Sequence, residues 1–351
     1  MSDIETIVLD LRKKFGEQSI FILGKDERAH IKVRSSGSLM LDLALGGGYP
    51  QGRMIEFRGQ EKSGKTTLAC LAIAEAQVSE PDKLNAIIDL EHSFNPEWAK
   101  VLGVDINKLL VSQPDTYAEK IYEMIEEMLQ SGKFAIIVVD SVASMICKEE
   151  FEEKDWEASK VGLSARVNAK AMRRLVSTGL LQKSGTTLIF INQLREKIGA
   201  FSLYGTSTET PGGRALRHNY SQILEVALGE QFVKGTGDNK QVLGQQIKIR
   251  CIKNKIAPPY RTATIDLYYD TGVDRITELV NVAKTLNILS GSNWLKLINP
   301  LTGEVILDEQ GNEIKFNGFA KTVEAIKEDL TKEGKLYDLI FNLVNEVIRN
   351  S

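Results

Sequence analysis

The chain has 351 residues, 42% hydrophobic and 26% charged, and its 44 basic residues stand against 47 acidic ones, a net charge of −3. This composition indicates a folded globular protein of about two domains, excludes a disordered or fibrous chain, and confines any nucleic-acid surface to a local patch. The 3 cysteines form no C-x-x-C pair and no apolar run is long enough to span a membrane, so we expect a cytoplasmic protein without a disulfide framework or zinc site.

The N-terminal 35 residues hold one short helical pattern, Ile4 to Phe15, followed by a polar stretch that is too small to fold alone. Beyond it, segments of helical period, clearest at Thr66–Val78 and Tyr117–Gln130, separate short, continuous apolar runs. Such runs indicate strands buried on both faces, so residues 36–271 are predicted to form an α/β core around a mostly parallel sheet. The runs are Met54–Phe57, Asn85–Leu90, Ala135–Val139 and Thr187–Ile191.

The character of the chain changes after Gly272. A helix-rich segment begins with Ile276–Leu289, a hairpin is expected around Pro300–Gly303 and Gln310–Asn312, and amphipathic helices follow to Arg349. We therefore predict a small α+β C-terminal domain over residues 272–351.

A complete phosphate-binding motif, G-x-x-x-x-G-K-[ST], lies directly after an apolar run and directly before a helical pattern, which is the context that a P-loop requires. Its glycines let backbone N–H groups turn toward phosphates, its lysine reaches the β- and γ-phosphates, and its threonine offers a hydroxyl to Mg²⁺. The motif residues are Gly59, Gln60, Glu61, Lys62, Ser63, Gly64, Lys65 and Thr66.

Three other strand ends carry polar groups. Asp140 follows Ala135–Val139 and is predicted to be the second Mg²⁺ ligand beside Thr66. Glu91 lies where an attacking water must be polarised, although a solvated strand-end glutamate is also consistent with its position. Gln193 could sense the γ-phosphate and pass its presence to the segment that follows.

That following segment, Leu194 to Arg217, interleaves basic, apolar and aromatic residues with glycines. The combination suits single-stranded nucleic acid, but composition alone fits a flexible active-site lid equally well. An acidic loop, Lys148 to Lys160, is by itself more typical of a solvated surface. Lys253 and Lys255 lie on one strand face and could stabilise a γ-phosphoryl transition state, although without context a surface lysine pair is the better interpretation.

Taken together, these stretches closely resemble the bacterial RecA recombinase family across about Ser36 to Leu289. Besides the P-loop with Thr67, the resemblance depends on ordered matches that include Ser36–Leu39, Glu91-His92, Leu102–Asp105, Ser112–Thr116, Val138–Ala143, Ile189–Gln193, Lys197–Gly199, Gly212-Gly213 and Lys253–Ala257.

Residue roles follow from the resemblance. It makes Lys65 and Thr66 the phosphate and Mg²⁺ ligands, Asp140 the acid of the Walker B strand, Glu91 the general base and Gln193 the switch. Lys253 and Lys255 are expected to act in trans on the ATP of a neighbouring protomer. Asn95 and Trp98 are expected to line the adenine pocket, and Tyr269 to bind the nucleotide. It places two DNA-binding loops at about residues 152–161 and 194–214, with DNA contacts from Arg166, Arg195, Lys197, Ile198, Gly199, Gly212, Gly213 and Arg214.

The implied function is homologous recombination and DNA repair, including the SOS response. The chain is expected to polymerise on single-stranded DNA through an N-terminal arm (residues 1–35), to capture duplex DNA and to exchange strands, with DNA-dependent ATP hydrolysis. Candidate partners are a LexA-like repressor and a single-strand-binding protein. The alternatives are a ring-forming DNA motor ATPase of the same fold and a non-catalytic ATP-binding filament that coats DNA.

The sequence departs from the family pattern at several places. The second loop is two residues longer than expected, Val161 replaces a usual methionine, and Asn95 and Trp98 replace a usual aspartate and tyrosine. An extra hairpin-like segment is expected near Trp294 to Phe316. Because Lys321 to Ser351 balances 5 basic against 6 acidic residues, we do not expect the acidic tail that is common in the family. Such divergence fits a phage or mobile-element member.

Overall fold

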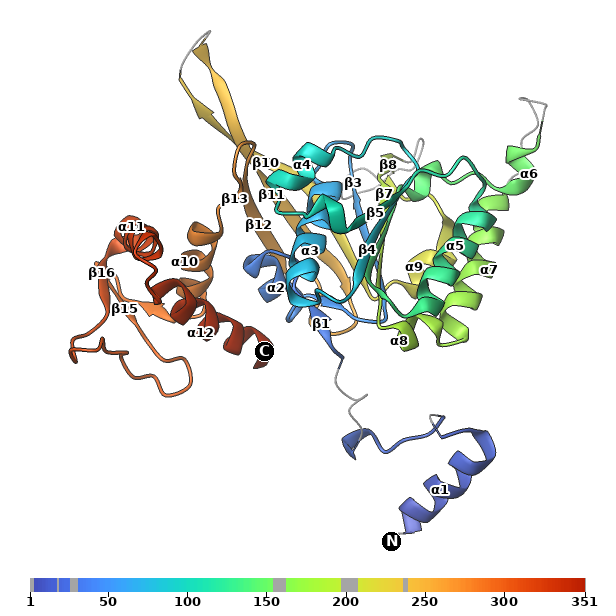
Figure 1. The fold of residues 1–351 in the computed structure, drawn as a ribbon, viewed down its shortest axis with the longest axis horizontal. Helices are drawn as coiled ribbons and strands as arrows, with labels where there is room; N and C mark the ends of the chain where they lie inside the picture. The colour runs from blue at the N-terminus through green and yellow to red at the C-terminus, as the bar shows by residue number, and fades with distance from the viewer. Residues whose placement is uncertain are drawn as a thin grey trace, which may run out of the picture. The chain divides into compact units, whose positions relative to one another are not determined.

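The computed structural model describes residues 3–17, 19–25, 31–153, 162–196, 208–235 and 239–350, and the chain divides into two compact units, residues 1–33 and 34–351 (Figure 1). The first unit contains α1 (Asp3–Phe15) and a 3₁₀ turn, η1 (Leu23–Lys25). The predicted N-terminal helix is thus confirmed. Its side chains Ile4 and Ile7 are 63% and 58% exposed, so this unit leaves apolar surface uncovered within the described chain.

A nine-stranded sheet organises the second unit, in the order β13-β12-β11-β10-β3-β7-β6-β4-β5. The five strands from β3 to β5 are parallel, and β10 joins them in parallel to β3 before the remaining strands continue antiparallel. The prediction of a mostly parallel sheet is confirmed. The strands are β3 (Met54–Gly59), β4 (Leu84–Asp89), β5 (Leu109–Ser112), β6 (Phe134–Asp140), β7 (Thr187–Gln193), β10 (Gln222–Lys234), β11 (Gln241–Asn254), β12 (Thr262–Tyr268) and β13 (Gly272–Val273).

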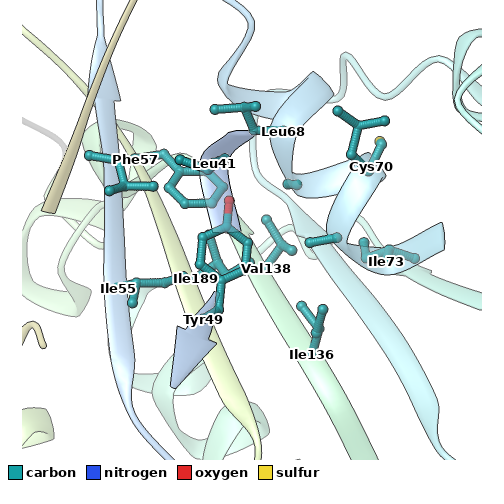
Figure 2. Close-up of a cluster of buried hydrophobic side chains, with 14 of the residues drawn as sticks. Leu41, Tyr49, Ile55, Phe57, Leu68, Cys70, Ile73, Ile136, Val138 and Ile189 are labelled. Atoms are coloured by element: carbon teal, nitrogen blue, oxygen red, sulfur yellow. The ribbon is translucent and has the colours of Figure 1, made fainter. Parts of the chain in front are cut away.

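Helices cover both faces of this sheet, which explains the continuous apolar runs. Ile136 and Val138 pack in one hydrophobic cluster with α3 (Lys65–Ser79), whereas Ile137 and Val139 pack in a second cluster with the helices of the opposite face. Figure 2 shows Leu68, Cys70 and Ile73 in the first cluster, with Ile136, Val138 and Ile189. The opposite face carries α5 (Ala118–Ser131), α7 (Leu163–Ser177), α8 (Leu180–Ser184) and α9 (Gly213–Asn219).

Short elements connect these layers. They are β1 (Val33–Arg34), α2 (Leu39–Leu45), β2 (Tyr49–Pro50), α4 (Pro96–Val101), η3 (Ile106–Lys108), η4 (Val142–Ser144), α6 (Lys148–Phe151), β8 (Arg195–Glu196) and β9 (Thr208–Glu209).

The C-terminal part has its own hydrophobic cluster, built by three helices and a small antiparallel sheet of order β14-β15-β16. The predicted extra hairpin lies between β15 and β16, where bridges join Ile298 to Val305 and Leu307 to Glu313. No helix among the described residues is long and apolar enough to cross a membrane. The elements are α10 (Arg275–Thr285), β14 (Leu289–Ser290), β15 (Trp294–Leu297), β16 (Lys315–Asn317), α11 (Gly318–Thr331) and α12 (Leu336–Asn350).

Candidate functional site

The P-loop joins the end of β3 to the start of α3 and folds around one lysine. Lys65 is 8% exposed, and its Nζ donates hydrogen bonds to the carbonyl oxygens of Gly59 at 3.2 Å and Gln60 at 2.6 Å. Burial lowers the pKa of Lys65, against the opposing effect of Asp140 and other nearby carboxylates. Gly64, at φ 96°, precedes α3 in a left-handed conformation that favours glycine. The loop therefore presents a cation and a helix N-terminus at the same place, which is the chemistry that phosphate binding needs.

The two predicted Mg²⁺ ligands lie in contact. Thr66 Oγ1 donates a hydrogen bond to Asp140 Oδ2 at 2.7 Å, so the first turn of α3 and the end of β6 converge. Burial raises the pKa of Asp140 to about 6, with the Thr66 hydrogen bond opposing this effect. A hydroxyl and one carboxylate fit Mg²⁺, which usually takes few protein oxygens and completes its shell with water and substrate phosphates. In the described part of the chain, no cluster of three His, Cys, Asp or Glu side chains offers a different metal site.

Glu91 lies just beyond β4, beside the end of β6. Its Oε1 accepts hydrogen bonds from Ser141 Oγ at 2.5 Å and from Gln193 Nε2 at 3.2 Å. Asp89, at the end of β4, is the register partner of Asp140 on β6, so carboxylates gather at one edge of the sheet. The structure thus brings together the predicted base, the predicted switch and the predicted metal ligands.

A pocket of about 390 Å³ lies over the P-loop. Trp98 and Tyr269 meet edge to face in it, with ring centroids 6.4 Å apart, and Trp98 Nε1 donates to Thr67 Oγ1 at 3.3 Å. Two lining residues, Gln245 and Leu267, are cross-strand partners on β11 and β12 that sequence reasoning missed. The lining residues are Lys62, Ser63, Gly64, Lys65, Thr66, Thr67, Trp98, Gln245, Leu267 and Tyr269.

Not every residue predicted for the nucleotide lines this pocket. Gly59, Gln60 and Glu61 lie in the first half of the loop, outside the lining. Asn95 is exposed and caps α4, its Oδ1 accepting a hydrogen bond from the backbone N–H of Trp98 at 3.1 Å. Asn95 therefore holds the backbone of Trp98 and does not line the pocket itself.

The predicted DNA loops are only partly described. Arg195 and Glu209 pair through their main chains in the two-stranded β8–β9 sheet. Arg166 and Arg214 are exposed, on α7 and α9. Lys197, Ile198, Gly199 and positions 154–161 of the first loop lie outside the described residues.

The glycines at the end of the second loop allow close packing of α9. A Cβ on Gly212 would lie 2.5 Å from Leu216 Cδ1, and a Cβ on Gly213 would lie 3.0 Å from Ala165 Cβ on α7. Gly212 O also accepts a hydrogen bond from Asn168 Nδ2 at 2.9 Å. These contacts join the end of the second predicted DNA loop to α7, the helix that follows the first predicted DNA loop.

Lys253 and Lys255 do not line the nucleotide pocket of their own chain. They cap the C-terminal end of α9 instead. Lys253 Nζ donates hydrogen bonds to the carbonyl oxygens of Arg217 at 2.7 Å and His218 at 3.1 Å. Lys255 Nζ donates to the same carbonyl oxygen of His218 at 3.3 Å. Burial, with the charges of Lys255 and Arg217, lowers the pKa of Lys253.

Comparisons with known proteins agree with this geometry. A family model described as RecA N-terminal domain matches residues 2–274. The chain is 43% identical over 304 residues to Protein RecA of Mycoplasma mycoides subsp. mycoides, covering 86% of this chain and 85% of the relative. It is 44% identical over 293 residues to Protein RecA of Listeria monocytogenes serotype 4a, covering 83% and 81%. It is 44% identical over 283 residues to the chromosomal Protein RecA of Lactococcus lactis subsp. lactis, covering 80% and 71%.

Proposed function

Because the chain belongs to the RecA family, we propose that it is a DNA recombinase that forms filaments on single-stranded DNA, pairs this DNA with a homologous duplex and exchanges strands. The recombinase hydrolyses ATP in a DNA-dependent manner. One observation carries this proposal: Gln193, which ends the strand leading into the second loop, donates its hydrogen bond to Glu91 beside the P-loop.

The P-loop site supports ATP hydrolysis through residues already in position. Lys65 is the cation for the β- and γ-phosphates, and it would exchange its carbonyl partners in the loop for phosphate oxygens. Thr66 and Asp140 would hold Mg²⁺, which offsets charge on the phosphates when bound. Glu91 accepts the proton of the attacking water, and the hydrogen bonds from Ser141 and Gln193 fix the position of its carboxylate.

Contacts with neighbouring protomers complete the assembly in this proposal. Lys253 and Lys255 lie away from their own nucleotide pocket, which suits a role at the pocket of the next protomer. The edge strand β5 leaves Leu110 and Val111 47% and 43% exposed, so it offers an apolar edge to which another strand can add. A site completed between protomers makes hydrolysis depend on the filament that DNA nucleates.

The test is a strand-exchange assay between circular single-stranded DNA and linear duplex DNA, with ATP and Mg²⁺. We expect joint molecules with a homologous duplex and none with a heterologous duplex of equal length. Electron microscopy of the same mixture should show helical filaments. Closed rings that translocate without pairing DNA would favour the motor alternative, and filaments without ATP turnover would favour the DNA-coating alternative.

A further inference from the structure

Glu56 is a carboxylate in the core that the catalytic site described above does not use. It lies on β3, three residues before the P-loop begins, and is 1% exposed. Its strand neighbours Ile55 and Phe57 pack on the α3 face, whereas Met54 packs on the opposite face. Because side chains alternate along a strand, Glu56 faces the layer that contains α7 and α9.

The side chain of Asn192 binds Glu56 and two other parts of the chain. Asn192 Nδ2 donates to Glu56 Oε1 at 2.9 Å and to the carbonyl oxygen of Pro211, at the end of the second loop, at 3.0 Å. Asn192 Oδ1 accepts from the backbone N–H of Gln193 at 3.0 Å. One fully buried amide group therefore contacts the strand of the P-loop, the end of the DNA loop and the switch residue.

Stability alone does not explain a carboxylate at this place. Burial raises the pKa of Glu56, and the Asn192 hydrogen bond and the charges of Arg58, Arg217 and Lys253 only oppose that effect. Its Oε2 has no hydrogen-bond partner in the part of the chain that the structure describes. An apolar side chain of similar volume would avoid this desolvation cost. The carboxylate does supply the acceptor that orients Asn192.

The contacts on either side of Asn192 connect the two functional regions. Toward the nucleotide, the Asn192 amide fixes the backbone of Gln193, whose side chain contacts Glu91. Toward DNA, it fixes Pro211, next to Gly212, whose carbonyl oxygen binds Asn168 on α7. A displacement at either end must move the Asn192 amide or break one of its hydrogen bonds.

We propose that Glu56 is a positioning residue that couples DNA binding to nucleotide binding by holding the Asn192 amide between Gln193 and Pro211. This inference rests on the proposed function, because it presumes that DNA contacts the second loop. Glu56 touches neither nucleotide nor DNA in this role. Its removal reduces communication between the two sites and leaves each site intact.

Coupling is measured as a ratio, in which a purely structural loss cancels. The affinity for a fluorescent single-stranded oligonucleotide is measured with ADP and with a slowly hydrolysed ATP analogue, and the ratio of the two dissociation constants is compared between variants. Binding linkage is reciprocal, so the oligonucleotide must strengthen binding of the analogue relative to binding of ADP by the same ratio. Coupling in allosteric proteins is typically about 5- to 150-fold.

We expect Glu56→Ala and Asn192→Ala each to lower the ratio about tenfold, and the double variant to lower it no further than Asn192→Ala, because Glu56 acts only through the Asn192 amide. Glu56→Gln keeps a carbonyl acceptor for Asn192 and should restore most of the coupling. If Glu56→Ala does not fold, Glu56→Leu is used in its place, because leucine fills the space without offering a hydrogen-bond acceptor. Glu225→Gln is the matched control, since Glu225 lies on the neighbouring strand β10 and pairs with Arg58 at 2.9 Å.

The inference would be overturned by a ratio in folded Glu56→Ala within twofold of wild type, or by single-variant losses that multiply in the double variant. Failure of Glu56→Gln to restore coupling would also contradict it, because the acceptor would then not be the essential feature. A wild-type protein whose DNA affinity does not respond to nucleotide would instead refute the proposed function. The two failures are therefore distinguished within one experiment.

Discussion

Replacing Asp140 by asparagine should make the nucleotide-free protein more stable while abolishing its response to Mg²⁺. Burial raises the pKa of this carboxyl from 3.8 to about 6 in the folded state. Below pH 3.8 the group is protonated in both states and costs nothing. Between pH 3.8 and 6 the unfolded state loses its proton first, so the folded state loses stability as the pH rises.

The size of this effect follows from the two pKa values. At about 1.4 kcal/mol per pH unit, keeping Asp140 ionised in the folded state costs about 3 kcal/mol at pH 7 and about half of that at pH 5. Asparagine has the same shape, can still accept the Thr66 hydrogen bond and carries no charge. Asp140→Asn should therefore raise the free energy of unfolding by up to about 3 kcal/mol at pH 7.

Urea unfolding in EDTA at pH 7 and pH 5 measures this gain, and the same experiment with ATP and Mg²⁺ measures the lost metal response. Asp89→Asn is the matched control with the opposite sign. Burial alone would raise the pKa of Asp89, but hydrogen bonds from Gln113 and from the backbone N–H groups of Phe94 and Ser93 hold it below its usual value. Replacing Asp89 should therefore destabilise the protein at pH 7. An Asp140→Asn protein that is less stable than wild type in EDTA, or a gain that does not shrink at pH 5, would show that ionised Asp140 does not destabilise the folded protein.

Three further predictions follow from the site. Trp98→Ala should weaken nucleotide binding about tenfold in fluorescence titrations, because it removes one aromatic side of the pocket, and Trp98→Phe should lose less. Lys253→Ala should keep nucleotide affinity but lower DNA-stimulated turnover about 10³-fold, and a normal rate would show that it does not act at a neighbour's ATP. Gly212→Ala should lose about 1–3 kcal/mol in thermal unfolding, since its Cβ would lie 2.5 Å from Leu216 Cδ1 at φ 102°. Gly24→Ala is the control: no atom lies within 4 Å of the added Cβ, so it should change the free energy of unfolding by less than about 0.5 kcal/mol.

The inner parallel strands β3, β4, β6 and β7 were predictable from sequence because they are buried on both faces of the sheet. The run Ala135–Val139 lies within β6, every residue of which is buried. The antiparallel half was less visible, because β12 alternates between buried and more exposed positions. The parallel edge strand β5 was also missed, because two of its four residues are exposed. The predicted helical segment Ile276–Leu289 is too long, because α10 ends at Thr285 and Asn287 adopts φ 58°.

Motif residues of the site were predictable because they are adjacent in sequence, as Lys65 and Thr66 are. Gln245 and Leu267 were not, since only the pairing of β11 with β12 brings them over the P-loop. Glu56 did leave a signal, a single acid inside an apolar run, but the sequence does not indicate that it contacts Asn192 on β7.

The proposed coupling of DNA binding to hydrolysis is tested most directly by ATP turnover of the purified protein with and without single-stranded DNA, together with Lys65→Ala and Glu91→Gln. We expect turnover that DNA stimulates strongly and that both substitutions abolish, because one removes the phosphate cation and the other the base. Turnover that is equal with and without DNA would contradict the proposed coupling, since the contact between Gln193 and Glu91 would then transmit nothing from the second loop to the site.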